Sequence, residues 1–120
     1  MIGKLNLTDL NNLAGFVGAA LVDSESGMSM ATEGGGNIDL GLAAAGNTEV
    51  VRAKRKVMAN LGLKDDLEDV LISLEKQYHL LRPLESSPEL FLYVVLDRAR
   101  ANLAMARHEL KAFEKTLDFS

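Results

Sequence analysis

Three carboxylates lie close together in the first third of the chain: Asp23, Glu25 and Glu33. Paired carboxylates can act as general acid and base, or can bind a metal ion. However, the first two belong to a run of Asp, Ser, Glu and Gly residues (23–27), and such residues favour tight turns. No histidine lies nearby in the sequence. We therefore expect solvated turn carboxylates, with no catalytic role and no metal.

A run of three glycines (34–36) precedes a segment of helical pattern. Glycine-rich loops before helices can cradle phosphates, but a P-loop ends in Gly-Lys-Ser/Thr. Here the following residues end in Asp39, which would repel a phosphate. The two histidines, His79 and His108, are far apart, and no serine lies in a Gly-x-Ser-x-Gly context. The sequence therefore predicts no cofactor, no metal site and no enzymatic activity.

Residues 52–56 form a basic cluster that includes Arg52, Arg55 and Lys56. Cations near the C-terminus of a helix interact favourably with the helix dipole and can simply stay solvated. Alternatively, the cluster could dock an acidic protein surface or an anionic lipid headgroup. We keep both interpretations and take Arg52, Arg55 and Lys56 as candidate partner-docking residues.

Length and composition limit the class of protein. The chain has 120 residues, 48% of them hydrophobic and 25% charged, which is ordinary for a globular protein, and we expect a single domain over residues 1–120. A net charge of −4 and an aromatic content of 5% argue against nucleic-acid binding. No apolar run reaches the roughly 18 residues of a membrane span, and the N-terminal segment lacks the pattern of a secretory signal. We expect a cytoplasmic protein without integral membrane association.

The elements that position these residues begin with a short helix. Leucines at positions 5, 7, 10 and 13 predict about two helical turns. The segment 15–33 then has two strand patterns joined by the polar turn, and predicts a hairpin. Because the first strand is apolar on both faces, we expect it near the centre of its sheet, with helices on both sides.

A second helix is predicted from a cap at Asn37 or Asp39 to about Asn60, with Gly62 just beyond its end. It carries two apolar stripes at helical spacing. The first consists of Ala43, Gly46, Val50, Ala53, Val57 and Leu61, and the second consists of Leu40, Ala44, Val51 and Met58. One stripe is enough to pack a helix on its own sheet, so the second predicts contact with something else.

The second half of the chain predicts three strands and a final helix. The strands cover about 70–75, 78–84 and 90–96, and the last of these is apolar on both faces. The helix is predicted to start near Arg98 or Ala99 and has an amphipathic stripe running to Leu117. The predicted order is α-β-β-α-β-β-β-α, with a five-stranded antiparallel sheet covered by helices on both faces.

Two segments, GFVGAALVDSESGMSMA (15–31) and FLYVVLDRARANLAMARHEL (91–110), resemble the roadblock (dynein light chain-like) family. The more specific feature is a last strand that ends in Leu-Asp-Arg and runs into a helix containing Asn-Leu-Ala. The resemblance covers about residues 7–117. It implies a profilin-like three-layer α/β/α sandwich, and homodimers or heterodimers in which the second helices pack together and the third strands can join two sheets.

The resemblance also implies function. Members are non-catalytic regulators of nucleotide-hydrolysing partners, among them dynein light chains, scaffolds on membranes and bacterial partners of small Ras-like GTPases. We therefore expect a homodimeric regulator or scaffold of a small Ras-like GTPase or another NTPase. The alternative is a small-molecule sensor, or a scaffold module without a GTPase partner. The candidate dimer interface consists of Leu40, Ala44, Val51, Met58, Val70 and Ile72.

Overall fold

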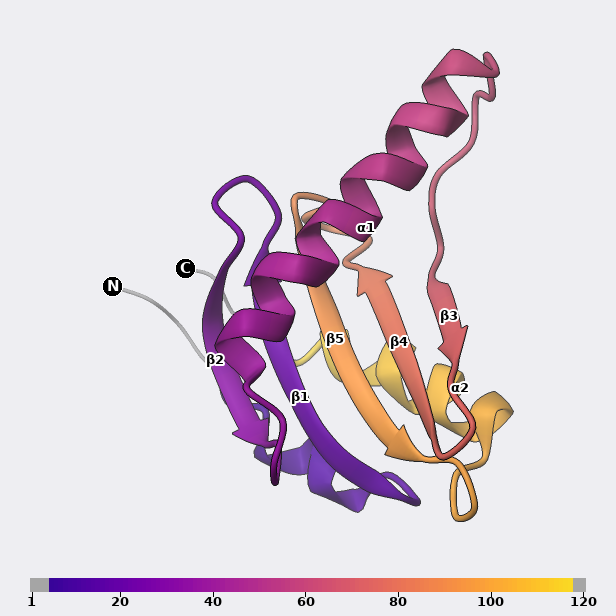
Figure 1. Ribbon diagram of the computed structural model, residues 1–120. Helices are drawn as coiled ribbons and strands as arrows, with labels where there is room; N and C mark the ends of the chain where they lie inside the picture. Colours follow the sequence, from indigo (N-terminus) through magenta and orange to yellow (C-terminus); the bar gives the residue numbers. More distant parts are fainter. Residues whose placement is uncertain (1–4, 118–120) are drawn as a thin grey trace.

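In the computed structural model, which describes residues 5–117, five strands form one antiparallel sheet with helical layers on both sides (Figure 1). The elements are η1 (Thr8–Asn12), β1 (Phe16–Asp23), β2 (Met28–Gly34), α1 (Leu40–Asn60), β3 (Val70–Ser73), β4 (Gln77–Pro83), β5 (Leu90–Asp97) and α2 (Leu103–Glu114). The strand order across the sheet is β2-β1-β5-β4-β3. The predicted sheet is therefore confirmed.

β1 and β5 form the centre of the sheet, as their apolar composition predicted. They pair antiparallel, with Ala20 opposite Tyr93 and Leu21 opposite Leu92. β4 continues the sheet beside β5 and ends at Pro83, where the ladder would lack a donor. The short strand β3 and the hairpin strand β2 are left at the two edges.

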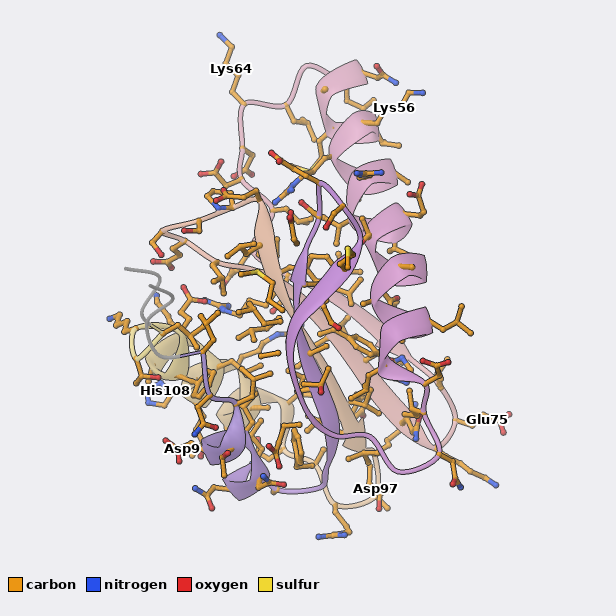
Figure 2. All side chains as sticks on the ribbon, turned by 90° about the vertical axis from the view of Figure 1, so that its left-hand side faces the viewer. Asp9, Lys56, Lys64, Glu75, Asp97 and His108 are labelled. Carbon is orange, nitrogen blue, oxygen red and sulfur yellow. The ribbon has the colours of Figure 1, made fainter. Side chains whose placement is uncertain are left out.

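Each face of the sheet has its own hydrophobic core. α1 covers one face, and α2 together with η1 covers the other, as the side view of Figure 2 shows. The core on the α1 side includes Ala20, Val22, Ala44, Val51, Phe91, Tyr93 and Val95. The core on the α2 side includes Leu7, Leu10, Leu21, Leu92, Leu96, Ala106 and Leu110. The alternation of side chains along β1 and β5 divides them between these two layers.

The glycine-rich segment after β2 brings the chain close to β1. A Cβ added at Gly18 would lie 2.6 Å from the Cα of Gly35, so β1 has no room for a side chain at this position. The chain then enters α1 through Asp39, whose carboxylate accepts a hydrogen bond from the Leu42 N–H at 3.0 Å. This cap occupies the helix N-terminus, which argues against a phosphate site. The predicted end of α1 at Asn60 is also confirmed.

The first helix is a 3-10 helix rather than the predicted α-helix, so the order of regular elements starts with β1. Its hydrogen bonds join Leu10 N–H to the Leu7 carbonyl and Leu13 N–H to the Leu10 carbonyl, at 3.0 Å each. The reason is the spacing of the three buried leucines. They recur every three residues, which places them on one side of a helix with three residues per turn.

The last helix starts later than predicted. The carbonyl of Asp97 accepts hydrogen bonds from the N–H groups of Arg100 and Ala101, which makes a turn before the helix. Asn102 then caps α2, because its side chain accepts a hydrogen bond from the Met105 N–H at 3.1 Å.

Candidate protein-interaction surface

α1 packs on the sheet through the stripe that sequence analysis had assigned to a dimer. Ala44 and Val51 have no exposed surface, and Leu40 is 9% exposed. A side chain that is fully covered within one chain has no surface left for a partner. The prediction that Leu40, Ala44 and Val51 face a second copy is therefore corrected: they belong to the core of the domain.

The same side of the helix includes Thr48, which is also buried. Its hydroxyl donates a hydrogen bond to the Ala44 carbonyl at 2.7 Å, so the buried polar group has a hydrogen-bond partner. The fourth member of the predicted interface on α1, Met58, is only half-buried and lies near the end of the helix.

The other apolar stripe of α1 is exposed. It matches the prediction from Gly46 to Leu61, but its first predicted member, Ala43, is half-buried against the core, and the exposed Leu42 lies at that end instead. We call this exposed row the α1 outer stripe, and it consists of Leu42, Gly46, Val50, Ala53, Val57 and Leu61. Leu42 is 71% exposed, Val57 46% and Leu61 66%. The members are spaced by four, four, three, four and four residues, so they form one row that is roughly 28 Å long. In Figures 1 and 2 no other described element covers this side of α1.

Gly46 lies in the middle of the α1 outer stripe. A Cβ at this position would meet nothing within 4 Å. Glycine inside a helix costs stability relative to alanine, and the fold of the single chain gives no reason for it here. Small residues in a helix face do allow the backbone of a second helix to approach closely.

The basic cluster is partly used inside the domain. Arg52 donates a hydrogen bond to the Glu25 carbonyl at 2.6 Å, and Arg55 donates one to the Pro88 carbonyl at 2.7 Å. These contacts connect α1 to the β1–β2 turn and to the loop before β5. Lys56 is exposed and lies near the end of α1 in Figure 2. A docking role for the three residues remains a prediction.

The edge strand β3 carries the remaining two residues of the predicted interface. Val70 and Ile72 are half-buried and pack against the core on the α1 side. β3 pairs with β4 on one side only, since it is the last strand of the sheet. Its other edge is open to pairing among the described residues, and pairing with a second chain there remains a prediction.

A polar cluster lies on the α1 side of the sheet and was not predicted. The Oε1 atom of Gln77 lies 2.9 Å from Nε2 of His79, and the tautomer with its proton on Nε2 fits this contact. Nδ1 of His79 then accepts the hydrogen bond of the Tyr93 hydroxyl, at 3.1 Å. Burial lowers the pKa of His79 and raises the pKa of Tyr93, and the neighbouring Asn47 side chain partly offsets the shift of Tyr93. The groups satisfy one another, as in a structural cluster.

Two ion pairs hold α2 and also had no signal in the sequence. Nε of Arg82 lies 3.0 Å from Glu114, and the two side chains are 4% and 7% exposed. Arg107 makes two hydrogen bonds to Asp69, at 2.9 and 3.2 Å, and these raise the pKa of the guanidinium. The partners are 32 and 38 residues apart in the sequence, where no local pattern can indicate the contact.

The carboxylates singled out first have ordinary roles in the turn and on β2. Asp23 accepts hydrogen bonds from the Glu25 N–H and the Ser26 hydroxyl, at 2.9 and 3.3 Å. Glu33 accepts a hydrogen bond from Asn11 at 2.7 Å. Within residues 5–117, no three side chains of the His, Cys, Asp or Glu type lie together as metal ligands. None of the helices in this range is long and apolar enough to span a bilayer.

Solved structures share this fold. A roadblock/LC7 domain from Streptomyces avermitilis superposes with a TM-score of 0.77 at 17% identity, covering 88% of this chain and 85% of that one. The gliding protein MglB from Thermus thermophilus gives 0.69 at 17% identity, covering 91% and 85%. MglB from Myxococcus xanthus gives 0.65 at 19% identity, covering 85% of each. The chain therefore has the roadblock fold, as the resemblance implied. No protein-family model and no curated protein sequence matches it.

Proposed function

We propose that this chain forms a homodimer through the α1 outer stripe, and that the dimer is a non-catalytic regulator or scaffold of a small Ras-like GTPase. The observation that carries the proposal is the exposed apolar row along α1. Contiguous apolar patches on the surface of a protein mark interaction sites. The length of the row and the glycine at its centre suit a second α1 helix better than a small ligand.

The fold and the sequence resemblance support the same proposal. MglB, one of the proteins with this fold, has been described in a tetrameric arrangement. The roadblock resemblance adds the class of partner, a nucleotide-hydrolysing protein. Arg52 and Arg55 bind loop carbonyls of their own chain and hold α1 in place on the sheet, so a dimer would present a fixed surface to its partner. The dimer would then act by holding the switch region of its partner in one conformation.

The dimer is tested by sedimentation velocity on the wild-type protein and two variants. Val57→Glu places a charge in the α1 outer stripe, and we expect a folded monomer. Met105→Glu is the matched control, because Met105 is an equally exposed apolar side chain on α2. We expect this variant to remain dimeric. A wild-type protein that stays monomeric at high micromolar concentration contradicts the proposal.

The partner is tested with purified small Ras-like GTPases from the same source, loaded with GDP or with a non-hydrolysable GTP analogue. We expect binding that depends on the nucleotide, and a changed rate of GTP hydrolysis or of nucleotide exchange. The Val57→Glu variant should lose this effect while Met105→Glu keeps it. Binding that is equal for both nucleotide states, with unchanged rates, supports a scaffold without regulation. No binding to any of them refutes the GTPase part of the proposal.

A further inference from the structure

α1 extends beyond the sheet, and the chain then turns back toward β3 (Figure 1). A half-open groove lies beside this end of α1. It has a volume of about 560 Å³. Three segments enclose it: the last turns of α1, the connector 63–68, and residues 82–88 at the end of β4 and in the following loop.

The base of the groove is apolar. Met58, Leu67, Pro83 and Leu84 line it, and Pro88 adds a further apolar surface. Leu63 lies at its border and is 52% exposed. An exposed leucine next to a partly covered methionine provides a contact for an apolar side chain from outside.

The border of the groove is acidic. Asp65, Asp66, Glu68 and Glu85 line it, and none of these carboxylates forms an ion pair with another residue in the described chain. The groove also contains two arginines, of which only Arg82 has its charge paired within residues 5–117. Arg55 donates to the Pro88 carbonyl and Arg82 is paired with Glu114. Arg55 keeps its positive charge, but the four carboxylates outweigh it, so the lining is negative in balance, which disfavours phosphates, nucleotides and anionic lipids and attracts cations.

The connector offers its backbone as well. Within the described part of the chain, no backbone–backbone hydrogen bond involves residues 64–69. The Asp66 N–H is taken up by the Asp65 carboxylate at 2.9 Å, and the other N–H and C=O groups of this segment are available to a ligand with donors and acceptors along its length. An extended peptide provides such groups, and peptides often bind by lying along a free segment of main chain.

We propose that this groove binds a short extended peptide segment of a partner protein, in which lysine or arginine residues flank a leucine or methionine. The apolar side chain enters the base beside Met58, and the basic side chains contact Asp65, Asp66, Glu68 and Glu85. The site is separate from the α1 outer stripe, because Val57 and Leu61 do not line it. It therefore does not depend on the proposed dimer or on the GTPase.

The first test measures binding of fluorescein-labelled octapeptides by fluorescence anisotropy, at roughly 0.15 M salt. The probe has a central Lys-Leu-Lys-Leu sequence flanked by glycine and serine. One control peptide has glutamate in place of each lysine, and another has serine in place of each leucine. We expect the probe to bind and both controls to bind at least about tenfold more weakly, since each lacks one of the two complementary features. No binding of the probe, or equal binding of the controls, overturns the proposal.

The second test locates the site with charge-reversal variants. Asp66→Lys combined with Glu85→Lys should weaken binding of the probe by about tenfold or more, because attractive contacts become repulsive. Glu75→Lys combined with Glu109→Lys changes the net charge equally at two exposed positions that do not line the groove, and should leave binding unchanged. If the charge reversals disturb folding by circular dichroism, Asp66→Asn with Glu85→Gln replaces them.

The outcomes separate this site from the other possible occupants and from the proposed function. An equal loss in both double variants means non-specific attraction and overturns the proposal. Absence of peptide binding, together with changed sedimentation of the groove variant, means that a second copy of the chain fills the groove, which also overturns it. The Val57→Glu variant should bind the probe like wild type, so failure of the dimer and failure of the peptide site are seen separately.

Discussion

At the scale of single residues, the polar groups that hold the layers together are paired over long sequence distances. Glu114 shows this most clearly: one carboxylate oxygen pairs with Arg82 and the other accepts the Glu85 N–H at 3.2 Å. A buried pair of this kind cannot be left half-formed without leaving an uncompensated charge. The polar cluster of Gln77, His79 and Tyr93 is the uncharged counterpart on the other face of the sheet.

The state of His79 leads to a prediction on pH. Because burial lowers its pKa in the folded protein below 6.5, the unfolded chain binds its proton more readily. This contribution to stability is therefore fully present above about pH 6.5 and is lost as the pH falls toward the folded-state pKa. We expect the free energy of unfolding, measured by urea titration, to fall as the pH decreases below about 6.5, in part because of this one group.

Two variants isolate the contribution of His79. His79→Gln keeps a polar side chain beside Tyr93 but does not titrate, so the slope just below pH 6.5 should become smaller than in wild type. His108→Gln, at an exposed position on α2, is the matched control and should keep the wild-type slope. If the slopes of wild type and His79→Gln are the same, protonation of His79 is not linked to folding.

Such residue contacts could not be predicted from the sequence, whereas the turn residues could. The run of Asp, Ser, Glu and Gly predicted a turn because each of these residues acts on its own neighbours, and Asp23 does bind the backbone two residues on. By contrast, nothing in the sequence near His79 indicates Tyr93, because the pairing of β4 and β5 brings them together. Hydrogen bonds between neighbours in the sequence can be predicted from the residue types, whereas those between distant residues can be predicted only once the fold is known.

At the scale of elements, α1 shows what a pattern can and cannot predict. Its ends were predicted correctly, because the Asp39 cap and Gly62 act on the adjacent turns. Its two apolar stripes were also predicted, but their roles were reversed. The sheet-facing side contains Ala44 and Thr48, which are less hydrophobic than the Val57 and Leu61 of the outer stripe. When both sides of a helix are apolar, hydrophobicity alone does not tell which side packs against the sheet, and the more hydrophobic side of α1 is the exposed one.

Replacing the glycine in the α1 outer stripe by alanine should have opposite effects on the stability of the monomer and on self-association. In the single chain, Gly46→Ala fills open space and removes the cost of glycine in a helix. It should therefore stabilise the monomer by about 0.5–1 kcal/mol. If a second α1 packs closely at this point, the added methyl group should weaken self-association.

Both effects can be measured separately. Introducing Gly46→Ala into the monomeric Val57→Glu variant and unfolding it with urea gives the effect on the helix. Sedimentation of Gly46→Ala alone gives the effect on the dimer. Unchanged or stronger self-association would show that the helices do not approach each other at Gly46, and would place the contact elsewhere on the stripe.

At the scale of the whole molecule, the sheet explains why most of the fold was predictable. β1 and β5 are apolar on both faces, so they had to lie at the centre of the sheet with other elements packed on each face. A sheet with helical elements on both sides has three layers. The same argument cannot predict surfaces beyond the domain. The outer side of α1 and the groove at its end depend on how far the helix extends past the sheet, which no residue pattern of the helix specifies.

The proposed dimer makes the stability of the whole molecule depend on its concentration. When association is linked to folding, the dimer is favoured by mass action, and the thermal midpoint rises with protein concentration. We expect a higher Tm at higher concentration for wild type and for Met105→Glu. For Val57→Glu the Tm should be independent of concentration, because its folding is unimolecular. A wild-type Tm that stays constant across the range in which sedimentation detects dissociation would mean that the dimer dissociates on heating before the chains unfold, so that dimerisation and folding are not linked at the thermal midpoint.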